Sequence, residues 1–170
     1  MRVQAEMNQV LNDTIRILLS QKPDAQAEVR GSKEFSDIMG EVMFYPLWRG
    51  TLVVASISGL PQSAEHCRGG FYGFHIHSGN RCTGNQEDPF ADTGMHWNTT
   101  HCDHPGHSGD FPVLMGNDGY AMEAFYTDRF YPEEVIGKTV IIHEMPDDYR
   151  AQPSGNSGRK IACGQIISGK

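Results

Sequence analysis

The sequence lacks the long apolar runs that membrane spans need. Only 38% of its 170 residues are apolar, and no stretch approaches the ~18 consecutive apolar residues of a transmembrane helix. Basic residues are scarce, with 14 Lys and Arg against 21 Asp and Glu and a net charge of −7. A nucleic-acid-binding protein needs a basic surface to displace counterions. We therefore expect a protein that engages neither membranes nor nucleic acids.

A secretory signal and the common zinc motifs are also missing. Glu6 and Asp13 interrupt the apolar positions near the N-terminus, so no compact hydrophobic region of a signal forms there. This favours a cytoplasmic location, or export with the signal already removed. Neither a helical HExxH motif nor CxxC pairs occur, which excludes the usual metalloprotease and zinc-ribbon classes.

The chain instead contains 19 Gly and 9 Pro, which is typical of a loop-rich β-protein. Residues 1–22 have apolar positions near a 3.6-residue period and predict a short helical extension. Residues 23–170 alternate with period two or form β-branched runs separated by turns, and they predict one all-β domain. The expected strands are 25–29, 42–44, 51–58, 71–77, 113–115, 120–126, 139–143 and 161–167.

Histidines gather in one part of the sequence. Six of the eight lie between His75 and His107. We interpret His66, outside this range, and His101, within it, as ordinary surface or core histidines. His75 and His77 lie two residues apart on a predicted strand, so both imidazoles project from the same face. Phe74 and Ile76 then point into the core. Two converging imidazoles suit copper or zinc.

A second group of ligands follows in a stretch that cannot be a regular helix, because it contains Pro105, Gly106 and Gly109. Three histidines and one carboxylate form a closed tetrahedral set, as in a structural zinc site. A closed site leaves no position for water, so zinc hydrolysis is not expected. The residues of this set are His96, His104, His107 and Asp110.

His143 ends the apolar strand 139–142 and can join His75 and His77. Three or four imidazoles around one ion favour copper(II) over zinc. The sequence therefore predicts a redox metal beside a structural one.

In this order, the motifs resemble those of copper/zinc superoxide dismutase. The resemblance runs from about Ala25 to Ile167. It rests on Gly73-Phe74-His75-Ile76-His77, Gly94-Met95-His96-Trp97-Asn98, His107-Ser108-Gly109-Asp110, His143-Glu144, and Gly155-Asn156-Ser157-Gly158 leading into Ala162-Cys163-Gly164.

The resemblance implies a Greek-key antiparallel β-barrel or sandwich, whose two long loops build a metal site on its outer face. It implies copper on His75, His77, His96 and His143, and zinc on His96, His104, His107 and Asp110, with His96 bridging both ions. It further implies that Asp147 links a copper histidine to a zinc histidine.

The resemblance also implies a disulfide between Cys82 and Cys163. Cys67 and Cys102 have no counterpart in the family. Either they form a bridge that ties the zinc loop to the sheet, or both are free thiols.

One position departs from the family pattern. The family places an arginine near copper, just before the Ala-Cys-Gly segment, to guide the anion. Lys160 occupies that slot here and Arg159 precedes it. A one-residue slip reverses the facing of a strand residue, and lysine lacks the bidentate fork of arginine. We therefore expect a local positive field from Lys160 or Arg159, with Lys160 facing copper. The 144–160 loop is also shorter than in the common eukaryotic enzyme, and the stretch before His96 is longer.

The resemblance implies that the protein is an enzyme that disproportionates superoxide to oxygen and hydrogen peroxide. His96 would leave copper and carry a proton during the cycle. One alternative is a copper/zinc buffer or delivery protein with little turnover, and another is a structural Greek-key domain that keeps only zinc. The sequence leaves the oligomeric state open, with a homodimer as one option.

Overall fold

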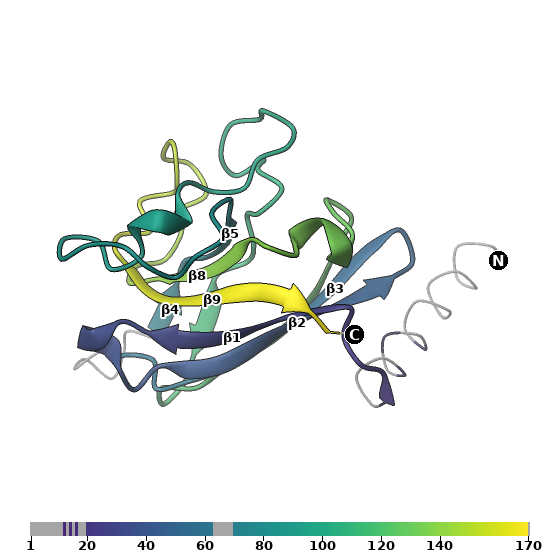
Figure 1. Cartoon of the computed structure of the whole chain (residues 1–170), viewed down its shortest axis with the longest axis horizontal. Helices are drawn as coiled ribbons and strands as arrows, with labels where there is room; N and C mark the ends of the chain where they lie inside the picture. The colour runs from purple at the N-terminus through teal and green to yellow at the C-terminus, as the bar shows by residue number, and fades with distance from the viewer. Residues whose placement is uncertain (1–11, 13, 15, 17–19, 63–69, 170) are drawn as a thin grey trace.

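The computed structural model describes residues 12, 14, 16, 20–62 and 70–169 (Figure 1). The helical extension expected over residues 1–22 lies mostly outside this range, although Asn12, Thr14, Arg16 and Ser20 are helical. His66 and Cys67 also lie outside the described residues. In the described part of the chain, no helix has the length and apolar character required to cross a membrane.

The described chain is built from strands and three short 3-10 helices. The strands are β1 (Ala25–Gly31), β2 (Met39–Leu47), β3 (Gly50–Ser58), β4 (Gly70–Tyr72), β5 (Phe74–His77), β6 (Leu114–Gly116), β7 (Ala121–Thr127), β8 (Thr139–His143) and β9 (Lys160–Ser168). The 3-10 helices are η1 (Lys33–Phe35), η2 (Ala91–Thr93) and η3 (Pro132–Val135). Nine strands are present where seven or eight were expected, partly because the predicted strand 71–77 divides at Gly73 into β4 and β5.

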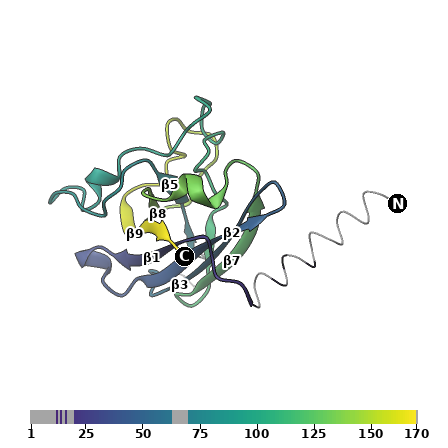
Figure 2. The same cartoon turned by 45° about the vertical axis from the view of Figure 1, so that its right-hand side comes forward.

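Seven strands form one antiparallel sheet in the order β5-β8-β9-β1-β2-β3-β7, and β4 pairs with β6 in a second sheet. The large sheet is curled, and β5 and β7 are its two edge strands (Figure 2). The pairs β9–β1 and β3–β7 join strands that are distant in sequence, which is consistent with Greek-key connections. The prediction of an all-β antiparallel fold is confirmed.

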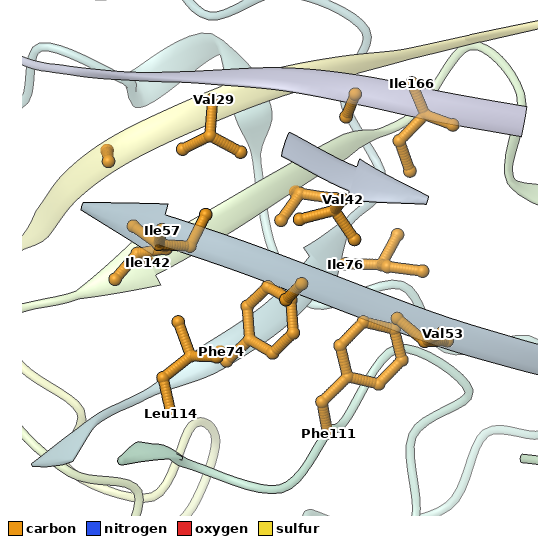
Figure 3. Close-up of a cluster of buried hydrophobic side chains, with 14 of the residues drawn as sticks. Val29, Val42, Val53, Ile57, Phe74, Ile76, Phe111, Leu114, Ile142 and Ile166 are labelled. Atoms are coloured by element: carbon orange, nitrogen blue, oxygen red, sulfur yellow. The ribbon is translucent and has the colours of Figure 1, made fainter. Parts of the chain in front are cut away.

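The core lies inside the curled sheet. In β1 the burial alternates along the strand, with Ala25, Ala27 and Val29 facing inward. Phe74 and Ile76 of β5 join this core, where the Phe74 ring lies 5.1 Å from that of Phe111 (Figure 3). The inward direction of Phe74 and Ile76 agrees with the prediction. His75 and His77 therefore leave β5 on the opposite face.

Two long loops cover that opposite face. Residues 78–113 and 144–159 rise on the same side of the sheet, above β5 and β8 (Figure 1). A disulfide between Cys82 and Cys163 ties the first loop to β9, as predicted. Cys102 is exposed and unbridged among the described residues. Cys67 lies outside them, so the choice between a Cys67–Cys102 bridge and two free thiols stays a prediction. The loops bury the histidines that a bare sheet would leave in water.

Candidate metal centre

The first loop is attached to the sheet through β5, an edge strand whose outer backbone groups pair with the loop: Ile76 N–H donates to the Gly109 carbonyl and the Ile76 carbonyl accepts from Trp97 N–H, both at 2.8 Å. Isolated bridges pair His75 with Asp110 and His77 with His96. Gly109 lies so close to β5 that a Cβ at this position would meet the Ile76 carbonyl oxygen at 2.4 Å. The edge of the sheet thus brings residues 96–110 beside the two strand histidines.

One group of four imidazoles forms where β5, β8 and the loop meet. Its ligand nitrogens all lie within 4.8 Å of one another, and every member is buried. The ring of His96 lies 3.9 Å from that of His75 and 4.9 Å from that of His77, between ring centroids. The members of the group are His75, His77, His96 and His143.

A second buried group shares His96 with the first and collects around one carboxylate. Asp110 Oδ1 lies 2.8 Å from His96 Nδ1, and Asp110 Oδ2 lies 3.0 Å from His104 Nδ1. His107 Nδ1 is 3.3 Å from Asp110 Oδ1. The predicted zinc residues are therefore brought together by the fold.

The hydrogen bonds of the first group show which ring nitrogens have free lone pairs. His75 Nε2 donates to Asp147 Oδ2 at 2.7 Å, since a carboxylate only accepts, and this leaves Nδ1 as the acceptor nitrogen. His77 Nδ1 faces the Gly94 carbonyl and His143 Nδ1 faces the Gly158 carbonyl. Their Nε2 atoms therefore both carry lone pairs, yet they face each other at 3.3 Å. Two facing acceptors need a cation between or beside them.

Buried nitrogens without hydrogen-bond partners give an independent test of metal binding. An unpaired buried polar atom costs free energy, and native proteins rarely tolerate several together. Among the described residues, such side-chain atoms are His75 Nδ1, His96 Nε2, His104 Nδ1, His107 Nδ1 and one carboxylate oxygen of Glu123. Four of these five atoms are ligand atoms of the two groups. The donor set therefore fits two neighbouring metal ions.

Burial favours the neutral form of three of these imidazoles. It lowers the pKa of His75 and of His77 well below the usual range, and it lowers the pKa of His143 to about 4. Burial would raise the pKa of the Asp110 carboxyl, but the hydrogen bond from His96 and the charge interactions with the zinc-group histidines together outweigh it, and the pKa is lowered. Neutral imidazoles and an ionised carboxylate are the forms that bind metal ions.

Asp147 connects the two groups. Its Oδ2 accepts from His75 Nε2, and its Oδ1 accepts from His104 Nε2 at 2.9 Å, with the side chain fully buried. Gly155, at φ +64°, lies directly against this carboxylate, since a Cβ there would meet Asp147 Oδ1 at 1.8 Å. This is the position that the resemblance implied for Asp147, where it orients one ring of each group.

Two further contacts hold the loop, and no sequence motif predicts them. Arg129 Nη1 donates to the carbonyl oxygens of Pro105, His107 and Asp110 at 3.2, 2.8 and 3.3 Å. Gln152 holds the backbone of His104 with both ends of its amide, at 2.7 and 3.1 Å. Neither residue belongs to a motif, so no local pattern could have identified it.

The two bases considered for anion guidance are both in ion pairs. Lys160 Nζ lies 2.8 Å from Asp88 Oδ2, while Arg159 pairs with Glu34 and Glu144. His101 is exposed, as expected for an ordinary surface histidine. Neither Asp88 nor Glu34 belongs to a sequence motif.

Comparisons with known proteins agree with this geometry. The family model described as copper/zinc superoxide dismutase matches residues 38–166. A Cu-Zn superoxide dismutase of Deinococcus radiodurans is 33% identical over 145 residues, which cover 75% of this chain and 76% of the relative. Another Cu-Zn superoxide dismutase, from Aquifex aeolicus, is 28% identical over 162 residues, covering 86% and 88% of the two chains.

Among solved structures, a double mutant of a SOD-like protein from Bacillus subtilis has a TM-score of 0.71 to this fold at 26% identity. The match covers 88% of this chain and 100% of that chain. The family match spans most of the described domain, and its residues 38–166 include all seven residues of the two buried groups. The chain therefore belongs to the copper/zinc superoxide dismutase family.

Proposed function

We propose that this chain disproportionates superoxide to oxygen and hydrogen peroxide, at a copper ion that shares His96 with a zinc ion. Family membership makes the chain an oxidoreductase with copper and zinc as cofactors. The observation that carries the finer proposal is the position of His96, which belongs to both buried groups. Its Nδ1 lies beside Asp110 and its buried Nε2 has no hydrogen-bond partner.

In this proposal, His75 would hold copper through Nδ1, and His77, His96 and His143 would hold it through Nε2. Nδ1 of His96, His104 and His107 and the carboxylate of Asp110 would hold zinc. Bound copper supplies alternating one-electron oxidation and reduction of superoxide, while bound zinc is redox-inert and fixes the loop.

The residues around the ions then perform the remaining tasks. Asp147 keeps the Nε2 atoms of His75 and His104 protonated, so that their Nδ1 lone pairs remain available for metal. His96 Nε2, buried and without a hydrogen-bond partner, would hold a proton and supply it to the second superoxide. Hydrogen peroxide requires two protons, so the other one would come from solvent. Lys160, at the start of β9, is the base in the position from which the anion could be attracted, and its ammonium is paired with Asp88.

The shared histidine gives the sharpest test of this proposal. The substitution His96→Ala should lower the affinity for both metals. His75→Ala should lower the affinity for copper and leave that for zinc unchanged, because His75 belongs only to the first group. Elemental analysis after loading and dialysis measures both effects, and a superoxide assay on the loaded protein measures turnover. A His96→Ala variant that keeps both metals at wild-type affinity would disprove the bridge. Full loading without turnover would favour a metal buffer or delivery protein.

A further inference from the structure

Lys160 is held next to the proposed copper site by its position in the sheet. It is the first residue of β9, and its backbone pairs with that of His143 in β8. The side chain is only 14% exposed. Its ammonium donates to Asp88 Oδ2 at 2.8 Å and to the Phe90 carbonyl oxygen at 3.1 Å. One positive charge beside the site is therefore paired directly with one negative charge.

The segment that carries Asp88 is fixed by its own contacts. Asp88 Oδ1 accepts from the backbone N–H of Phe90 at 2.9 Å, and the Asp88 N–H donates to the Asn85 side chain. The Phe90 ring packs against Ile141 and Cys163. Because the ring anchors this turn on β8 and β9, the carboxylate is presented to Lys160 rather than left to move in solvent.

Among the described residues that line the hollow beside Lys160, Arg159 is the other base, and it is paired as well. Arg159 points its guanidinium to Glu34 and Glu144, at 3.0 and 2.9 Å. Both bases line a hollow of about 450 Å³ whose wall also contains Glu34, Glu87 and Asp88. In the two ion-pair groups, three carboxylates face two bases, so their net charge is −1.

From this arrangement we infer that Asp88 is a positioning residue that suppresses anion attraction at the copper site, by neutralising Lys160. This inference rests on the proposed function. A carboxylate in contact with an ammonium reduces its field to that of a dipole, which falls off faster with distance than that of a single charge. The wild-type protein should therefore lack the electrostatic steering expected from its bases, and its overall charge of −7 should repel superoxide weakly.

The Phe90 carbonyl makes the inference testable. The substitution Asp88→Asn removes the negative charge, but Lys160 keeps its bond to Phe90 O and its partly buried stem. The ammonium should then stay in place with its charge unopposed. Glu87→Gln is the matched control, because it removes an equal charge from the neighbouring position in the same hollow. Thermal unfolding and zinc content identify any variant whose fold has changed.

The experiment measures the affinity of azide for the copper- and zinc-loaded protein from the copper absorption spectrum, across a range of ionic strength. At low salt, Asp88→Asn should bind azide roughly 3- to 10-fold more tightly than wild type, and the gain should shrink as salt rises. Glu87→Gln should change the affinity less than about twofold, since it does not free Lys160. The double variant Asp88→Asn with Lys160→Met should bind azide with nearly the wild-type affinity, because the two substitutions together remove a pair whose net charge is zero.

Superoxide turnover gives a parallel readout. The wild-type rate should stay level or rise with salt, whereas the Asp88→Asn rate should fall with salt from a higher value. The inference would be overturned if Asp88→Asn bound azide as tightly as the wild type or more weakly. That result would leave the dismutase proposal intact. A loaded wild-type protein that neither binds azide nor turns over superoxide would overturn both.

Discussion

At the residue scale, the two metal groups depend on which nitrogen of each ring is left without a proton. Asp147 accepts hydrogen bonds from Nε2 of His75 and of His104, and backbone carbonyls accept hydrogen bonds from Nδ1 of His77 and of His143. Each bond fixes a tautomer and directs the other nitrogen inward. The affinity for metal is thus set by groups that do not touch it.

The packing of Gly155 against Asp147 leads to a prediction. Gly155→Ala should lower the affinity for both metals by about 10- to 100-fold, because the new methyl group would displace the Asp147 carboxylate, which orients one ring in each group. Metal titration with a competing chelator measures this loss.

Gly137→Ala provides the matched control. Gly137 also has a positive φ, of +83°, but a Cβ there would meet nothing within 4 Å. It should cost about 1 kcal/mol of unfolding free energy from backbone strain and leave both metal affinities unchanged. Equal metal loss in the two variants would show that the effect of Gly155→Ala comes from strain and not from Asp147.

At the scale of elements, an edge strand and two loops build the site together. β5 pairs with β8 on one side and receives the loop residues 96 and 110 on the other. Residues 104–110 contain proline and glycine and make no regular ladder, so their carbonyl oxygens need donors from elsewhere. Arg129, which follows β7, supplies one donor to three of these oxygens.

We therefore predict that Arg129 supports the affinity for zinc more than the affinity for copper. Arg129→Gln should lower zinc affinity by about 10- to 100-fold, because the loop that carries His107 and Asp110 loses its support. Copper affinity should fall less, since His75, His77 and His143 lie on β5 and β8. Competitive chelation of each metal tests this difference.

Arg30→Gln is a suitable comparison, because the exposed Arg30 side chain pairs with Glu28 on β1, far from the loop contacts. If Arg129→Gln and Arg30→Gln bind zinc equally well, Arg129 has no positioning role.

At the scale of the whole molecule, the Cys82–Cys163 disulfide joins the site loop to the C-terminal strand across 81 residues of sequence. Closing a loop of this length restricts the unfolded chain, which the chain-entropy model values at about 4–5 kcal/mol. Replacing both cysteines by serine should lower the melting temperature by roughly 10 °C. It should also lower the protection of residues 82–90 against hydrogen exchange.

Cys102→Ser is the control for this prediction, because Cys102 is exposed and unpaired in the described part of the chain. It should melt within about 1 °C of wild type. If the double serine variant had the same melting temperature as the wild type, packing alone would hold the loop.

The residues alone predict the all-β class, three histidines of the first metal group and all four members of the second. Those predictions rest on local rules: residues i and i+2 share a strand face, as His75 and His77 do, and Pro and Gly between His104 and Asp110 exclude a helix. The order of the family motifs added the sharing of His96 and the Cys82–Cys163 pair, and the disulfide is present in the structure. Such features can be read along the chain because each is encoded within a few neighbouring positions or in an ordered set of motifs.

Only the tertiary structure decided which groups surround these residues. The sequence shows that residue 160 is a positively charged lysine. Its neutralisation depends on Asp88, which lies 72 residues earlier in the chain. Likewise, Arg129 finds three carbonyl oxygens and Gln152 finds the backbone of His104 only because two loops fold over one face. Electrostatic and hydrogen-bond energies depend on distance in space, and distance along the chain does not fix distance in space once loops of this length are involved.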